Sequence, residues 1–351
     1  MRELTTIKSM AISDRESKTI SCIRTTAMLF IVLCHYMQAL GYSVLGQLFT
    51  VGVPMFFMIS GFLYGQKNVY SNGGICNWYK NRIVKIVLPI YIYYLLTGII
   101  MMFLKNIGEI RIVEVICQLL NLQGFVKSGI GNIETGPLWF ITFILICYLI
   151  TPLLQKLRER ISVKKIFCII GVLYCIEIIF IIMVKPFGSI INLVGVVNYI
   201  FAYYIGAFWN KRLTVKVYVL LSAVMAISIG LRLIFKEIAD MSGGVAEEIY
   251  SKVIAGYSLT ALALWIFFTI YKLCNIFNKC LDEIYPIVSY LDKKSFYVYI
   301  VHYAFLVGKL SVMNITDNIV LNTLIFILCT YIYASIIQWI YKKIFKLILN
   351  L

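Results

Sequence analysis

Charged residues are scarce in this sequence: they make up 14% of 351 residues, whereas 61% are hydrophobic and the mean hydropathy is +0.89. A soluble globular domain is roughly half apolar and a quarter charged. The composition therefore excludes an ordinary soluble domain. It predicts an all-α fold, a polytopic transmembrane helical bundle whose length allows about ten spans of roughly 20 residues.

Residues that bind metals or perform familiar soluble chemistry are also few. Two His exclude a His-rich metal site, and the ten Cys form no C-x-x-C pair, so we expect no metal and no disulfide framework. The phosphate-binding G-x-x-x-x-G-K-[ST], the G-x-S-x-G elbow and the dinucleotide fingerprint are missing. No loop is long enough for a soluble catalytic domain, so any chemistry must take place inside the membrane bundle.

The apolar runs divide the chain into a series of predicted spans. Residues 1–22 and 342–351 are predicted as tails, and residues 23–341 as one membrane domain. We expect an outer loop with a short helix at 105–136, a polar outer loop at 236–251 and an inner segment at 272–295. The ten predicted spans are 23–43, 47–65, 84–104, 137–155, 166–184, 189–209, 217–235, 252–271, 296–313 and 318–340.

The formal charge of +16 follows the predicted topology. With the N-terminus inside, the inner segments hold 24 of the 32 Lys and Arg residues, as the positive-inside rule requires. Both termini are then cytoplasmic, and the polar N-terminus is not a signal peptide. Nucleic-acid binding needs a contiguous basic surface, and here the basic residues lie between apolar runs. We therefore expect the lipid bilayer as a partner and no nucleic acid.

Two ionisable residues on the first span are candidates for function. Arg24 and His35 are 11 residues apart, which places them on nearly the same helix face and about 16 Å apart along the axis. Snorkelling at the cytoplasmic edge also explains Arg24. It does not explain His35, which is too short to reach the interface, and His is suited to proton transfer near neutral pH.

The ninth span carries the second histidine. Ser295, Tyr299 and His302 fall on one helical stripe. His302 is either part of a site or a core histidine that is hydrogen-bonded to a neighbouring helix.

Other polar side chains leave two interpretations open. Arg82 and Lys85 at the start of the third span either follow the positive-inside rule or cradle phosphates. Glu177 is a proton acceptor or a hydrogen bond between helices. Trp139 is an interfacial anchor or a platform for a sugar ring.

Five segments occur in a fixed order along residues 24–302. Together they resemble the acyltransferase-three family of bacterial membrane O-acyltransferases, with Lys85 replacing the second Arg of an Arg-x-x-Arg element. The segments are Arg24-x10-His35; FFMISGF, which holds Ser60; RIVK, with Arg82 and Lys85; GPLWF, with Trp139; and SFYVYIVH, with Tyr299 and His302.

The resemblance implies a surface-glycan O-acetyltransferase-like enzyme in a bacterial cell membrane. The donor would be cytoplasmic acyl-CoA, with acetyl-CoA expected and a succinyl donor left open, and Arg24, Arg82 and Lys85 would lie near the CoA phosphates. His35 would be the general base on the acceptor hydroxyl, and Tyr299 and His302 would position the acyl group. Ser60, Trp139 and Glu177 are further substrate-binding candidates, and Ser60 is a weak candidate for a covalent role.

Two other classes compete with the enzyme. An exporter of polysaccharide or glycolipid would need polar residues on many spans, whereas the polar residues identified here cluster on spans one, three and nine. A structural partner in a glycan-synthesis complex predicts that His35→Ala is silent. The acceptor stays open between cell-wall glycan, surface polysaccharide and a lipid-linked saccharide.

Overall fold

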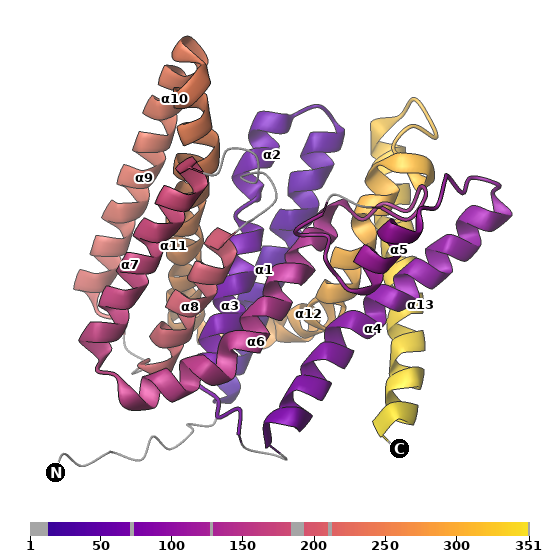
Figure 1. The fold of residues 1–351 in the computed structure, drawn as a ribbon. Helices are drawn as coiled ribbons and strands as arrows, with labels where there is room; N and C mark the ends of the chain where they lie inside the picture. Colours follow the sequence, from indigo (N-terminus) through magenta and orange to yellow (C-terminus); the bar gives the residue numbers. More distant parts are fainter. Residues whose placement is uncertain (1–12, 71–73, 127–128, 184–192, 210–212, 350–351) are drawn as a thin grey trace.

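The computed structural model describes residues 13–70, 74–126, 129–183, 193–209 and 213–349. Within these ranges the chain forms a helical bundle without a β-strand (Figure 1), which confirms the all-α prediction. The elements are α1 (Asp14–Ala39), α2 (Ser43–Phe49), α3 (Gly52–Gly65), α4 (Gly74–Phe103), α5 (Ile112–Leu119), η1 (Gly136–Leu138), α6 (Trp139–Arg160), α7 (Val163–Met183), α8 (Leu193–Ala207), α9 (Val215–Ser242), α10 (Gly244–Ile249), a π-helical turn (Tyr250–Ile254), α11 (Ala255–Ile276), α12 (Asn278–Leu306), η3 (Gly308–Leu310) and α13 (Ile319–Leu349).

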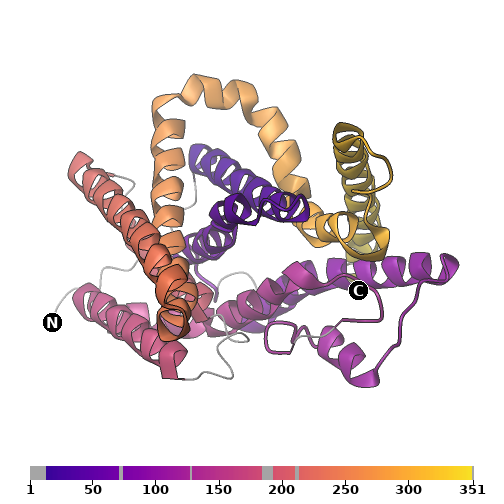
Figure 2. The ribbon, with the colours of Figure 1, turned by 90° about the horizontal axis from the view of Figure 1, so that it is seen from above.

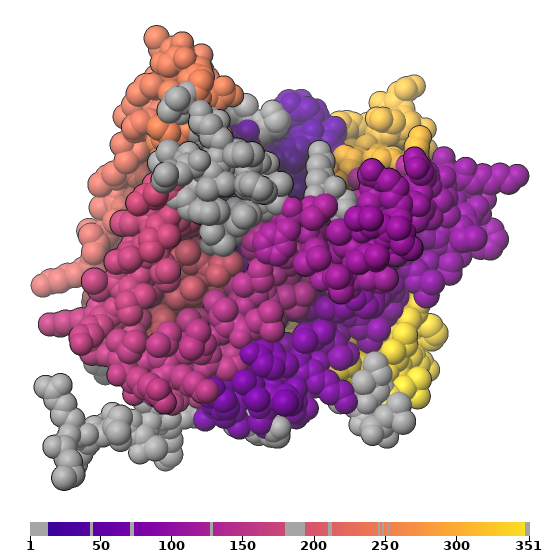
Figure 3. Space-filling view, in the orientation of Figure 1, coloured from indigo at the N-terminus to yellow at the C-terminus, as the bar shows by residue number. Residues whose placement is uncertain are grey.

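Several of these helices are long and apolar enough to cross a membrane. The outermost, α9, buries only 6% of its apolar window, and its exposed side chains include Val219, Leu220 and Ile227. Figure 3 shows α9 at the margin of the molecule, where such side chains suit contact with lipid. The protein is therefore a multi-pass membrane protein. Seven segments of the described residues meet the criteria for a span: Asp14–Ala39, Leu45–Gly65, Gly74–Phe103, Gly136–Arg160, Val215–Ser242, Ala255–Ile276 and Ile319–Leu347.

Two of the predicted boundaries are wrong. The polar segment 236–251 is helical, because α9 continues to Ser242 and α10 follows it. The predicted inner segment 272–295 is mostly helical as well, because α11 ends at Ile276 and α12, which contains Pro286, begins at Asn278. The ninth span was expected to end at 313, but α12 ends at Leu306. Polar side chains do not stop a helix that packs against neighbours, so hydropathy alone misplaces the end of α9. Helix α12 ends early for another reason: Gly308 has φ +77°, which does not continue a helix. Residues 184–192, at the junction of the fifth and sixth predicted spans, lie outside the described residues.

Helix α1 lies within the arch that α11 and α12 form, as Figure 2 shows in indigo and orange. Its start follows directly from the sequence. The Ser13 hydroxyl accepts a hydrogen bond from the backbone N–H of Glu16, the Ser-x-x-Glu arrangement that caps helix N-termini. From there α1 runs in contact with α12, so these two helices present their inward side chains to each other.

Helices α3 and α8 pack with their backbones unusually close. A Cβ atom added to Gly61 would lie 2.3 Å from the Tyr199 carbonyl oxygen, and one added to Gly65 would lie 2.0 Å from that of Tyr203. Gly61 and Gly65 are four residues apart and so share one face, the small-xxx-small pattern of helix association in membranes. This contact explains Gly61 in the FFMISGF segment: only glycine allows the approach.

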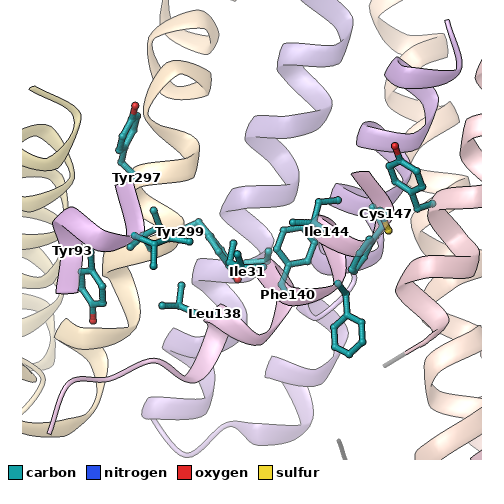
Figure 4. Close-up of a cluster of buried hydrophobic side chains, with 14 of the residues drawn as sticks. Ile31, Tyr93, Leu138, Phe140, Ile144, Cys147, Tyr297 and Tyr299 are labelled. Atoms are coloured by element: carbon teal, nitrogen blue, oxygen red, sulfur yellow. The ribbon is translucent and has the colours of Figure 1, made fainter. Parts of the chain in front are cut away.

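The core beside the two histidine-bearing helices is aromatic and aliphatic. Phe140 of α6 packs edge-on against Phe57 at 4.7 Å and against Tyr299 at 5.8 Å between ring centroids. Ile31 and Leu138 lie in the same cluster (Figure 4). This packing fixes the inward face of α12 relative to α1 and α6.

Candidate active site

The structure brings together the two histidines of the chain. The ring centroids of His35 on α1 and His302 on α12 are 5.3 Å apart. Tyr303 meets His35 edge-on at 5.0 Å. His302 is fully buried and His35 is half-buried. Residues separated by 267 positions thus form one polar centre inside the bundle.

The hydrogen bonds of His302 determine which of its ring nitrogens carries the proton. Nδ1 lies 2.8 Å from the carbonyl oxygen of Tyr299 and 3.2 Å from that of Val298. Because carbonyl oxygens only accept, Nδ1–H is the donor, and neutral His302 has its lone pair on Nε2. Nε2 is buried and has no hydrogen-bond partner among the described residues. An unsatisfied buried acceptor is costly, so this position favours a protonated neighbour, and the ring of His35 lies beside it.

The hydrogen bond of His35 is longer than those of His302. Its Nδ1 is 3.3 Å from Oε1 of Gln38, an exposed residue one turn along α1. With Nδ1–H donating to that oxygen, Nε2 of His35 is the nitrogen free to accept a proton. The half-buried position gives His35 the access to a substrate that fully buried His302 lacks.

The Tyr299 hydroxyl is engaged by the backbone. It donates to the carbonyl oxygen of Pro137 in η1, and the side chain is 4% exposed. This bond ties α12 to the turn before α6. Tyr299 therefore contributes to the site by holding the GPLWF segment and the α12 stripe together, and its ring lies 6.2 Å from that of His302.

Arg24 has a partner that the sequence analysis missed. Its Nη1 lies 3.0 Å from both carboxylate oxygens of Asp292 on α12. Asp292 lies in the segment 272–295 that was predicted as an inner connection, so nothing in the sequence pointed to it. The Arg24 side chain is 33% exposed, and it keeps access to solvent or a ligand beside this ion pair.

Other cations gather near the same end of the bundle. The Arg82 guanidinium lies over the ring of Tyr64 at 5.2 Å, and Lys85 lies 6.0 Å from the ring of Phe345. Partial desolvation, followed by the positive charges of Arg82, Arg24 and Lys85, lowers the pKa of Lys67. The three predicted cations therefore act electrostatically on one further lysine, which follows α3 and was not predicted.

Helices α1 and α12 are thus bridged at two levels. The Arg24–Asp292 pair forms one bridge, and the His35–His302 contact forms the other. The two levels are 11 residues apart on α1 and 10 on α12, about 15–16 Å at 1.5 Å per residue. Because the two bridges follow each other in the same order along α1 and along α12, the two helices run parallel. The cations lie at one end of this pair of helices and the histidines toward the other.

The remaining predicted residues make other contacts. Trp139 packs against Phe143 with centroids 6.0 Å apart. Ser60 of α3 lies beside Tyr148 of α6, whose ring meets that of Tyr64 at 5.2 Å. Glu177, 2% exposed on α7, accepts a hydrogen bond of 2.7 Å from Tyr257 of α11. None of these three contacts involves a histidine, and in Figure 2 α7 lies toward the periphery of the bundle, away from the part of α12 that nears α1.

Polar groups inside the bundle are more widely distributed than the sequence suggested. Arg232 of α9 is 7% exposed and donates to Ser258 of α11 at 3.2 Å. Asn198 of α8, fully buried, donates to Thr260 at 2.9 Å. The expectation that polar residues gather on the first, third and ninth spans is therefore wrong, and it no longer weighs against an exporter.

The fold and this site define a polytopic membrane protein with a cationic end and an intramembrane histidine pair. The family model described as an acyltransferase domain matches residues 18–348. The chain belongs to this acyltransferase family and is a membrane acyltransferase. A search of curated proteins and a search of solved structures each returned no match.

Proposed function

We propose that this protein transfers an acetyl group from cytoplasmic acetyl-CoA to a hydroxyl of a cell-surface or lipid-linked glycan. The observation that carries the proposal is the double bridge between α1 and α12. Cations at one level suit phosphates, and histidines about 15 Å further along suit acyl transfer. An extended pantetheine arm can span that separation, so one donor molecule can occupy both levels.

The donor end supports this assignment by its charge. Arg82 has a buried Nε without a partner among the described residues, and Lys67 lies within the field of three other cations. Clustered cations repel one another, and a polyanion relieves that repulsion. Arg24, Arg82 and Lys85 are accordingly the proposed CoA-phosphate ligands, with Lys67 as a fourth. In this proposal the protein lies in a bacterial plasma membrane. The cationic end of the bundle and both chain termini then face the cytoplasm.

The histidine pair supplies the proton transfers in this mechanism. The acceptor hydroxyl loses its proton to Nε2 of His35 as its oxygen attacks the thioester carbonyl carbon. The C–O bond forms, the C–S bond breaks, and the proton passes from His35 to the departing CoA thiolate. The lone pair on Nε2 of His302 favours the protonated form of its neighbour while His35 holds that proton. The closed bundle limits competing hydrolysis of the thioester.

The test is acyl transfer by the purified protein in lipid vesicles. We would supply labelled acetyl-CoA on one face at a time, offer a panel of glycans and follow the label in wild type, His35→Ala and Leu33→Ala. We expect turnover with CoA on the Arg24 face and a loss of about 10²–10⁴-fold in His35→Ala, the usual contribution of a general base. Leu33→Ala, a change in an exposed side chain of the same helix, is expected to retain most activity.

Two results would reject the proposal. If the wild type binds no CoA, the donor assignment is wrong and glycan export becomes the better reading. If His35→Ala transfers the label as fast as the wild type, the histidine pair is not the reacting centre.

A further inference from the structure

A carboxylate lies beyond the histidine pair, at the end opposite to the cations. Glu134 is half-buried in the loop before η1, and its backbone carbonyl accepts a hydrogen bond of 2.7 Å from the Tyr93 hydroxyl. Its side chain lies directly against Gly308, where a Cβ atom would come within 2.1 Å of Oε1. Gly308 has φ +77°, so both its conformation and the space available require glycine.

Tyr303 connects this carboxylate to the histidines. The edge of its ring lies against Gly136, where a Cβ atom would be 2.7 Å from Cε1. The same ring meets His35 at 5.0 Å. Gly136 is two residues from Glu134 in the chain, so the loop and Tyr303 form one wall that starts at His35 and ends at the carboxylate.

The carboxylate and the histidine pair lie near the same end of α12. His302 and Tyr303 lie near the C-terminal end of α12, which ends at Leu306, and Gly308, which contacts Glu134, follows directly after the extended Val307. A group on one sugar ring can therefore react at His35 while another hydroxyl of the same or the next residue reaches Glu134. The half-buried ring of Tyr303 lies between the two points.

The Glu134 carboxylate is not committed to a protein partner. The described residues include no ion pair and no hydrogen-bond donor to Oε1 or Oε2. Partial burial raises the pKa of this carboxyl group. An ionised carboxylate offers only acceptors, so the groups that it can bind well are O–H and N–H donors. Anionic ligands would be repelled from this position.

We propose that Glu134 and Tyr303 form an acceptor subsite, in which the carboxylate accepts hydrogen bonds from sugar hydroxyls and the Tyr303 ring packs against the sugar face. The subsite selects neutral or amino sugars and disfavours uronic and other acidic sugars. This assignment rests on the proposed function, since it takes the acceptor to be a glycan that reaches His35 from this side.

The experiment measures sugar binding separately from transfer. Wild type, Glu134→Gln and Glu109→Gln, an exposed outer-loop carboxylate that serves as the matched control, are titrated with neutral, amino and acidic oligosaccharides. We expect the wild type to bind a neutral or amino member, with Kd raised about tenfold or more in Glu134→Gln, as for loss of a hydrogen bond to a charged group. Glu109→Gln is expected to match the wild type. The binding of acidic members is expected to improve in Glu134→Gln.

Unchanged Kd in Glu134→Gln would overturn the subsite, and so would a wild type that binds acidic sugars only or no sugar in the panel. Transfer assays on the same samples separate the two proposals. Sugar binding that depends on Glu134 without any acyl transfer would reject the enzymatic proposal alone. Acyl transfer with the same acceptor KM in Glu134→Gln and wild type would reject the subsite alone.

Discussion

Replacing Gly65 by alanine tests the helix contact that positions the donor end. The new Cβ atom would lie 2.0 Å from the Tyr203 carbonyl oxygen and 2.7 Å from the backbone nitrogen of Ala207. Ordinary contact begins at 3.4 Å, so α3 and α8 would have to separate by up to 1.4 Å. Both obstacles are backbone atoms, which cannot rotate away. Overpacking of this kind costs about 1–3 kcal/mol.

The matched control is Gly171→Ala on α7. A Cβ atom at Gly171 meets nothing within 4 Å, and alanine there gains helix propensity of about 1 kcal/mol. The same chemical change should therefore lower the melting temperature at Gly65 and raise it at Gly171. Thermal unfolding of both variants in one detergent measures the difference. A Gly65→Ala protein that melts at or above the wild-type temperature would refute the close packing.

The Gly65→Ala substitution should also displace residues of the cationic donor site. The Gly65 carbonyl accepts a hydrogen bond of 2.7 Å from Arg158, and the neighbouring Tyr64 lies under the Arg82 guanidinium. A displaced α3 moves both groups. We therefore expect weaker CoA binding in Gly65→Ala and unchanged binding in Gly171→Ala, measured by titration of the same samples.

Two further predictions concern single charges. Asp292→Asn removes the carboxylate that now pairs with Arg24, so CoA should bind about tenfold more tightly. Because the pair is partly buried, with Asp292 11% exposed, the loss of stability should be about 1.5–3 kcal/mol. Titration and melting measure both effects, and unaltered CoA affinity would argue against Arg24 as a phosphate ligand. Because partial burial raises the pKa of Glu134 above its usual value of about 4.3, its carboxylate forms only at a higher pH than in free glutamate. Affinity for a neutral oligosaccharide should then rise with pH through that raised pKa and level off above it, and a Glu134→Gln protein with the same pH profile would contradict this.

The helical bundle could be predicted because membrane insertion imposes a strong local requirement. A run of about 20 apolar residues can hide its backbone only as a helix, wherever it lies in the fold. The ends of α9 and α12 could not be predicted in the same way. Lys236 pairs with Asp240 one turn later, and such contacts let a helix continue through polar residues. Hydropathy records the change in polarity and not the continuation of the hydrogen-bonded turns.

The candidate site, too, could be predicted only in part from the sequence. The sequence alone identified His35 and His302 as unusual, because an ionisable group within an apolar run is costly and so needs a reason to be there. It also placed Arg24 and His35 on one face of one helix, since the helical repeat is fixed. It could not indicate that Asp292 pairs with Arg24, or that Glu134 lies against Gly308. Those contacts join residues up to 268 positions apart, and only the way in which the helices pack brings such distant residues together.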